Sequence, residues 1–361
     1  MKTSPLFSNL AVLVAAISTS VLLYSTACTP SSEAPADSTS EPAPAAETVA
    51  GPVAAAGNVE PQFTLSADQT HNRFSRSIPP ILTVPSGAII ETYTEEASDG
   101  QLTADSTVEA VGELDFDPIH PLTGPIAVEG AKPGDMLKVT LLEIELGDYG
   151  WVAISPGFGF LADEFPDAFL RTFRFEEGAT EVAFNDSITL PLNPFPGVMG
   201  VAPDTDELLS TIPPRANGGN MDNKYMTVGT SIYFPVFVDG ANFSIGDAHA
   251  AQGDGEVCGT AIEAPTRVVF EIELIQGGRQ IAEPQYETDE YYAVTAFATT
   301  IDEAARKATR YMIDYLVTER GMDRTEAYVL CSLAGDLKIS EAVDVPHMLV
   351  SMHMPKSIFK S

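Results

Sequence analysis

Two segments between residues 215 and 263 concentrate side chains that can bind a cation or move a proton. Residues 215–226 read RANGGNMDNKYM, and residues 244–263 read SIGDAHAAQGDGEVCGTAIE. Residues two apart in an extended chain face the same way, so Asp247 and His249 can point at one site. Together with Asp222 they offer oxygen and nitrogen donors typical of a Zn²⁺ site that leaves one position open for water.

The same pattern also has a purely structural interpretation. Runs such as Gly253-Asp254-Gly255 often form plain turns, and a histidine such as His249 can be hydrogen-bonded inside a core. Glu256, two residues after Asp254, can face the same site or another one. Spacing alone leaves these interpretations open.

Other candidate residues lie outside these two segments. His71 precedes an early predicted strand, Asp99 follows it, and His120 lies beside a proline in the loop IHPLTG. A histidine in a polar loop is a modest sign of function. His347 and His353 lie in a late apolar segment, so we expect them to be structural.

Most of the chain has the pattern of short β-strands. Apolar runs with β-branched residues recur between clusters of glycine, proline and aspartate, which indicates a mainly β fold, a sandwich or barrel. The sequence Val238-Asp239-Gly240-Ala241 predicts a hairpin between two strands. We expect strands at residues 88–94, 136–146, 187–192, 231–238 and 267–274.

A small helical segment is expected near the C-terminus. Thr300, with Glu303 three residues later, has the pattern of an N-terminal cap, and Gly321 ends the apolar periodicity of residues 301–320. A second helix is predicted over 325–333. The apolar stripe of the first helix is typical of core packing, and we assign it no chemistry.

The composition excludes several classes of function. The chain has 361 residues, with 19 Lys and Arg against 51 Asp and Glu, and a formal net charge of −32. Such a chain lacks the basic face that binds nucleic acid or an anionic membrane, and it favours hard cations. Cys258 and Cys331 are too few for a disulfide framework, and we expect two buried thiols.

The first 58 residues have the pattern of an export signal and a tether. Residues 1–27 hold an apolar stretch and then the small residues that precede Cys28, as in a bacterial lipoprotein signal. We predict lipidation of Cys28 and a place in the cell envelope or periplasm; plain secretion and an uncleaved anchor are the alternatives. Residues 28–58 predict a disordered tether, so the folded body spans 59–361.

Several of these motifs resemble those of the acetamidase/formamidase family. Residues 246–256, GDAHAAQGDGE, and residues 218–222, GGNMD, carry the resemblance, and further matches such as HPLTGP at 120–125 run in order through residues 60–355. The resemblance implies a mainly β fold, hydrolysis of short amides to a carboxylic acid and ammonia, a divalent metal and a homo-oligomer. Two departures are the export signal, since family members are usually intracellular, and Phe74, in a region where the family often has tryptophan.

Metal-assisted hydrolysis of a small amide is the mechanism that fits these residues. A metal can polarise the carbonyl and lower the pKa of a bound water to about 7. We predict Asp222, Asp247 and His249 as ligands of Zn²⁺, with Ca²⁺ as the alternative ion. Glu256 is predicted to deprotonate the water and then protonate the departing nitrogen, or else to be a further ligand.

Four more residues are predicted to surround the substrate. We expect His71, His120 and Asp99 to orient the substrate or to bind the oxyanion. Asn220 is the candidate donor to the amide oxygen.

Two alternative functions stay open. Cys258 could be a nucleophile, with Glu256 or His249 as base and Lys224 as electrostatic partner. The chain could instead be a lipid-tethered β-sandwich that binds Ca²⁺ or another ligand without catalysis. Because Ca²⁺ sites use oxygen ligands, the imidazole of His249 discriminates between a calcium module and a transition-metal enzyme.

Overall fold

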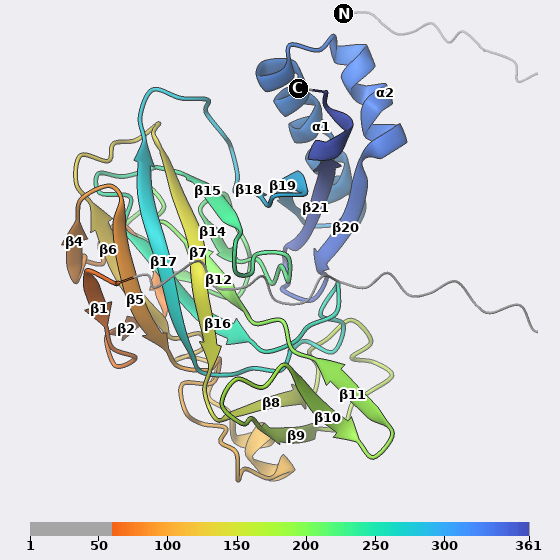
Figure 1. The fold of residues 1–361 in the computed structure, drawn as a ribbon. Helices are drawn as coiled ribbons and strands as arrows, with labels where there is room; N and C mark the ends of the chain where they lie inside the picture. The colour runs from red at the N-terminus through yellow and green to blue at the C-terminus, as the bar shows by residue number, and fades with distance from the viewer. Residues whose placement is uncertain (1–59, 361) are drawn as a thin grey trace, which may run out of the picture. The chain divides into compact units, whose positions relative to one another are not determined.

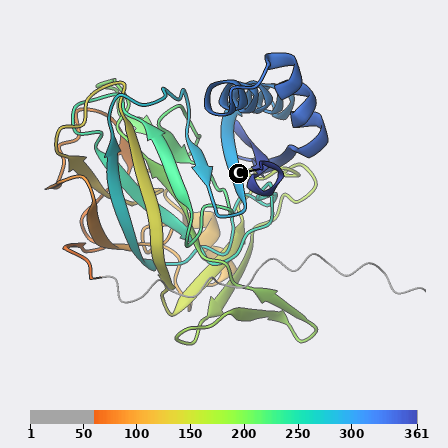
Figure 2. The same cartoon turned by 45° about the horizontal axis from the view of Figure 1, so that its top comes forward.

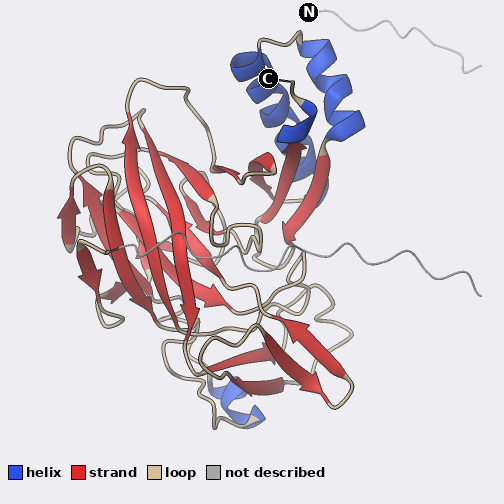
Figure 3. Cartoon of the chain, in the orientation of Figure 1, coloured by secondary structure: helices blue, strands red, loops and turns tan. Residues whose placement is uncertain are grey.

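The computed structural model describes residues 60–360. The predicted signal at 1–27, the lipidation site Cys28 and the tether at 28–58 lie outside the described residues. Strands are the main regular structure of the described part, and its α-helices gather near the C-terminal end of the chain (Figure 1, Figure 3). No helix among residues 60–360 is long and apolar enough to cross a membrane.

The largest sheet has nine strands in the order β1-β5-β17-β7-β15-β18-β19-β21-β20. Strands β1 and β5 pair in parallel, and the other neighbours are antiparallel. The strands are β1 Phe63–Leu65, β5 Ala88–Thr94, β7 Met136–Leu146, β15 Ser231–Pro235, β17 Thr266–Ile275, β18 Gln285–Glu287, β19 Tyr291–Ala298, β20 Asp336–Glu341 and β21 Met348–Pro355.

A second sheet has the order β14-β12-β16-β6-β2, and β4 also pairs with β6. Its strands are β2 Thr70–His71, β4 Leu82–Val84, β6 Leu122–Val128, β12 Phe195–Gly200, β14 Gly218–Asn220 and β16 Phe243–His249. Three two-stranded ribbons complete the strands of the described part. They are β3 Arg73–Phe74 with β13 Leu209–Ser210, β8 Tyr149–Ile154 with β9 Phe169–Arg174, and β10 Glu181–Asn185 with β11 Ile188–Pro191.

The two sheets pack face to face around one apolar core. Burial alternates along β5, as expected for a strand that is covered on one side. Phe243 of β16 lies against Phe234 of β15 and Phe270 of β17, and the ring centroids are 5.6 Å apart in both pairs. All three rings are fully buried, so they join the two sheets. The predicted mainly β fold is confirmed as a β-sandwich.

Helices α1 (Ile301–Arg320) and α2 (Arg324–Ala334) belong to a second apolar cluster with strands β19 and β21 (Figure 2). The Thr300 side chain accepts a hydrogen bond from the Glu303 N–H, and Gly321 ends α1 with φ 64°. Both predicted helices are confirmed, and the α1 stripe packs as core. Two short 3₁₀ helices are η1 Val108–Glu113 and η2 Lys356–Ile358.

The predicted hairpin at residues 238–241 is wrong. Strand β15 before it pairs within the nine-stranded sheet, whereas β16 after it pairs within the six-stranded sheet. Gly240, Ala241 and Asn242 all have positive φ, of 83°, 61° and 54°, and they turn the chain from one sheet to the other. The apolar faces of the two strands therefore meet across the core instead of lying side by side.

The late histidines and the cysteines have structural surroundings. His353 lies 2.6 Å from the Tyr286 hydroxyl and stacks on Tyr291. His347 donates from Nδ1 to a backbone carbonyl at 2.7 Å. Cys258 and Cys331 are free thiols as expected, but only Cys331 is buried; the expected burial of Cys258 is wrong, because its loop leaves it partly exposed.

Candidate active site

Six buried side chains converge at the end of strand β16, and we call them the carboxylate cluster. They are Asp222, Asp247, His249, Glu256, Glu263 and Asp344. Strand β16 supplies two of them, and the others come from the segment after β14, the loop between β16 and β17, and the segment after β20. Three overlapping groups of three have potential ligand atoms within 4.8 Å of one another. The structure thus gathers residues that lie far apart in the sequence.

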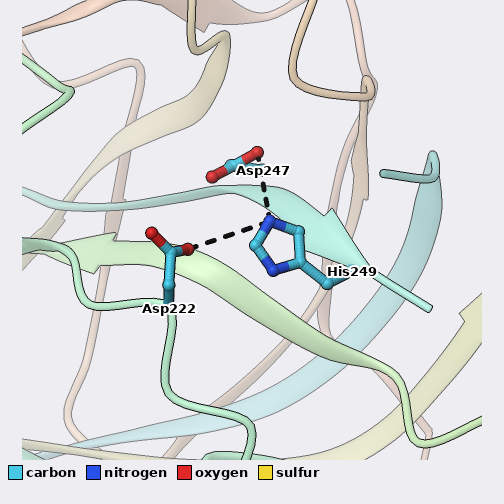
Figure 4. A group of neighbouring side chains, drawn as sticks. All are labelled: Asp222, Asp247 and His249. Atoms are coloured by element: carbon cyan, nitrogen blue, oxygen red, sulfur yellow. Dashed lines mark ion pairs between the residues drawn. The ribbon is translucent and has the colours of Figure 1, made fainter. Parts of the chain in front are cut away.

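His249 faces three carboxylates of the cluster, and Figure 4 shows it between two of them, Asp222 and Asp247. Its Nε2 atom is 3.1 Å from Glu263, 3.5 Å from Asp247 and 3.8 Å from Asp222, measured to the nearest carboxylate oxygens. Gln252 donates its amide N–H to the backbone carbonyl of Asp222 at 2.7 Å, so its amide oxygen accepts from His249 Nδ1 at 2.8 Å. The proton is therefore held on Nδ1, and Nε2 faces the carboxylates as a ligand atom.

The second side of the cluster is formed by Glu256 and Asp344, which share a group with Asp222. Asn220 donates from Nδ2 to Asp344 Oδ2 at 2.7 Å. His120 approaches from the first side, with its Nε2 3.9 Å from Asp247 Oδ2. The structure thus places His120 and Asn220 next to the predicted ligands.

An unusual backbone brings these groups together. Asp222, Asp247 and Glu256 have φ values of 38°, 51° and 45°, in the left-handed region that non-glycine residues rarely adopt. Such conformations concentrate at functional sites. Gly197 of β12 leaves the necessary space, since a Cβ atom there would lie 2.5 Å from Asp222 Oδ1 and 2.8 Å from His249 Cε1.

Several buried oxygens of the cluster have no hydrogen-bond partner. They are both oxygens of Asp222, Oδ1 of Asp247 and Oε2 of Glu263. An unpartnered buried carboxylate is costly, and the effective penalty reaches several kcal/mol. The cluster holds five carboxyl groups, and the cationic side chains that can face them are only His249 and the nearby His120. The donor types and the unpaired oxygens therefore fit a divalent metal ion.

Burial and mutual charge perturb the acids of the cluster. Burial raises the pKa of Asp222, Glu256 and Asp344, and it raises the pKa of Glu263 to about 7. Burial would also raise the pKa of Asp247, but attraction to His120 and His249 outweighs it and lowers that pKa to about 2. Neighbouring acids whose pKa values are shifted in opposite directions are typical of a functional site.

A cavity of about 130 Å³ opens onto the cluster. All six cluster residues line it, together with His120 and Asn220. Its remaining lining is mainly apolar and includes Trp151, Phe158 and Ile212. The cavity therefore has a charged end and an apolar end.

The structure does not bring His71 and Asp99 to this cavity. His71 binds Ser244 Oγ through Nε2 at 2.8 Å, near the start of β16, whereas His249 ends that strand about 16 Å further along. Asp99 is exposed in the turn after β5. The prediction that they surround the substrate is therefore not supported. Pairing of β2 with β6 holds His71 away from the cavity, and Asp99 faces solvent.

Five residues of the site or its support were not predicted from the sequence. They are Gly197, Gln252, Glu263, Asp344 and Trp151. Gln252 and Glu263 lie inside the segment 244–263, so they could have been found by asking which other polar side chains it holds. Asp344 is more than 80 residues away, and only the fold joins it to the cluster.

Cys258 lies beside the cavity but does not line it. Its thiol donates to the Thr260 carbonyl, with sulfur and oxygen 3.3 Å apart. It lines a neighbouring hollow, and Glu256 and Thr260 border both spaces. The geometry therefore gives the cysteine no direct approach to the carboxylate cluster.

Comparisons with known proteins show the family of the chain. A model described as the acetamidase/formamidase family matches residues 58–210 and 205–361. The chain is 32% identical to an acetamidase of Mycolicibacterium smegmatis over 273 residues, which cover 58% of this chain and 67% of that protein. It is 27% identical to a formamidase of Methylophilus methylotrophus, over 81% of this chain and 90% of that protein.

A solved structure gives the same result. A recombinant predicted acetamidase/formamidase from Thermoanaerobacter tengcongensis matches with a TM-score of 0.77 at 33% identity, covering 82% of this chain and 96% of that one. The match extends across nearly all of the described residues. The chain therefore belongs to the acetamidase/formamidase family, hydrolases that act on amide C–N bonds.

Proposed function

We propose that the chain is a metal-dependent amidase that hydrolyses small primary amides such as acetamide and formamide to a carboxylate and ammonia. The observation that supports it is the carboxylate cluster with its unpaired buried oxygens at the charged end of a closed-in cavity. Two relatives named acetamidase and formamidase fit this substrate class.

Asp222, Asp247 and His249 are the ligands that we propose, with Zn²⁺ as the expected ion. Their imidazole and carboxylate donors suit Zn²⁺ better than Ca²⁺, which prefers oxygen alone. When bound, a divalent ion supplies Lewis acidity to the amide carbonyl and lowers the pKa of water. Glu263 lies close enough to His249 to serve as a further ligand or to orient the ring.

Glu256 is the proposed general base. It is 7% exposed and lines the cavity between the two sides of the cluster. Its carboxylate would take a proton from the attacking water and return it to the nitrogen as the C–N bond breaks and ammonia leaves. Asn220 keeps one amide hydrogen beyond the one given to Asp344, and His120 has an unpaired Nδ1, so both can contact the amide.

Ammonia release from formamide and acetamide tests this function. The protein should release ammonia when metal-replete, and treatment with a chelator should abolish the release. Activity without metal would refute the metal dependence. No release from any small amide by metal-replete protein would refute the amidase function and favour a tethered binding module.

We also propose that the mature chain is exported, begins at Cys28 and carries lipid there. The apolar run that ends in Ser-Thr-Ala-Cys supports this proposal. Mass spectrometry of the native N-terminus should find a diacylglyceryl mass on Cys28. An intact Met1 would refute export, and a lipid-free Cys28 at the N-terminus would refute the anchor.

Assembly as a homo-oligomer is a further proposal, which rests on the resemblance to the family. Sedimentation velocity of the tether-free body should give at least twice the mass of one chain. A monomer at micromolar concentration would refute it.

A further inference from the structure

We propose that the apolar end of the cavity is an acyl pocket, and that the preferred substrates are primary amides with a branched or cyclic apolar acyl group. This inference rests on the proposed amidase function and names the substrate class of the same site. It predicts that such amides are better substrates than formamide, which has no carbon beyond its carbonyl.

The size of the cavity supports the inference. Its volume is about 130 Å³, and an apolar cavity of about 150 Å³ is large enough to hold benzene. Formamide would leave most of the apolar end empty. A whole amide of about six non-hydrogen atoms, such as isobutyramide, matches the space.

The lining residues indicate how a substrate would be oriented in the cavity. The carboxylates and Asn220 occupy the charged end, where the amide group must lie to be hydrolysed. Phe116, Ile119, Trp151, Phe158 and Ile212 make up most of the apolar part of the cavity lining. With its amide at the carboxylates, a substrate would place its acyl chain among these side chains, and their burial would favour an apolar chain.

Trp151 is a fixed wall of this pocket. Its Nε1 donates to Glu96 Oε2 at 2.7 Å, and both residues are almost fully buried. The Glu96 carboxylate also accepts from the backbone and hydroxyl of Ser98 and from the Gly100 N–H. Glu96 is thus held by several donors and positions the indole ring, so the pocket is formed before a substrate arrives.

Phe158 is a second apolar side chain of the cavity lining, and its position depends on a glycine. A Cβ atom at Gly259 would lie 2.4 Å from Phe158 Cδ1, so the ring packs directly on that backbone. The Phe158 N–H donates to the Ser155 carbonyl at 3.0 Å, which holds the turn. We therefore assign Phe158 as a specificity-determining residue.

The test compares kcat/KM for formamide, acetamide, propionamide and isobutyramide with metal-replete protein. The wild type should favour isobutyramide over formamide by at least about 10-fold, as expected for added methyl groups in an apolar pocket. Phe158→Ala should reduce this ratio about 10-fold. Phe160→Ala is the matched control, because Phe160 lies in the same loop, is 54% exposed and does not line the cavity, so the ratio should be unchanged.

Product inhibition of the wild type tests the same proposal even if the Phe158→Ala variant does not fold. Isobutyrate should inhibit acetamide hydrolysis competitively with a Ki at least about 10-fold below that of formate. Formamide as the best substrate, equal inhibition by both acids, or equal effects of the two phenylalanine variants would overturn the acyl pocket and leave the amidase function standing. No ammonia from any of the four amides would overturn the amidase function itself.

Discussion

Glu256 is the residue whose replacement best separates the chemistries that this site could support. Glu256→Gln keeps the size of the side chain and removes the base, so ammonia production from acetamide should fall by about 10²–10⁴-fold. The free energy of unfolding should change by no more than about 1 kcal/mol. Cys258→Ala is the control and should retain activity. Full activity of the glutamine variant with loss in the alanine variant would replace the metal mechanism with a thiol mechanism.

Gln252 should determine how well the cluster holds a metal. It is the hydrogen-bond partner of His249 Nδ1, and such partners of ligand histidines typically contribute 10–100-fold to affinity. Gln252→Leu should therefore weaken Zn²⁺ binding, measured by competition with a chromogenic chelator, by about that factor. Gln101→Leu, at an amide that bonds two backbone carbonyls away from the cavity, should leave Zn²⁺ affinity unchanged. Equal Zn²⁺ affinities of the two variants would show that Gln252 does not contribute to metal binding.

At the scale of elements, strand β12 makes room for the cluster through Gly197. Gly197→Ala should force Asp222 and His249 apart, because the new Cβ would overlap their side chains. The variant should bind substoichiometric Zn²⁺ by elemental analysis. Gly253→Ala, in the acidic loop with nothing within 4 Å of its Cβ position, should bind as much metal as the wild type. Normal metal content in Gly197→Ala would show that this contact is not needed.

Local patterns predicted single elements much better than their arrangement. Strands β5 and β7 and helix α1 begin and end where residue periodicity and the Thr300 cap predict, because these signals act within a few residues. The turn at 238–241 contains the Asp-Gly pair that is typical of a hairpin. The strands on its two sides nevertheless belong to different sheets, because Phe234 and Phe243 pack against each other across the core.

The same distinction applies to the site. Asp247 and His249 lie on one face of β16 through strand alternation, and Asp222 joins them because β14 and β16 both pair with β12. His71 and Asp99 had equally suitable side chains, but strand pairing and a solvent-facing turn keep them away. Asp344 could not be assigned without the fold, since nothing near it in the sequence marks it as part of the cluster.

At the scale of the whole molecule, two neutral histidines, the buried His353 and the partly buried His71, make the free energy of unfolding depend on pH. Burial lowers the pKa of His71 to about 4 and that of His353 to about 3, from an ordinary value of 6.5. At a pH between the lowered pKa of each histidine and 6.5, the unfolded chain binds more protons than the folded one. Their contribution to stability is therefore complete above about pH 6.5 and is lost as the pH falls toward 4, with a slope of up to about 1.4 kcal/mol per pH unit for each histidine.

His353→Gln should remove one of these two contributions. Glutamine can still accept a hydrogen bond from the Tyr286 hydroxyl but does not titrate. Urea denaturation at pH 7, 6 and 5 should give a shallower loss of unfolding free energy for the variant than for the wild type. Parallel pH profiles would contradict a neutral buried His353.

The central claim is that a divalent ion in the carboxylate cluster is needed for amide hydrolysis, and one titration tests it most directly. Metal-free protein should release no ammonia from acetamide, and stepwise addition of Zn²⁺ should restore release in proportion to bound ion until the cluster is filled. His249→Ala should bind less Zn²⁺ and stay inactive at the same additions. Ammonia release by metal-free protein, or full activity of His249→Ala, would contradict the claim.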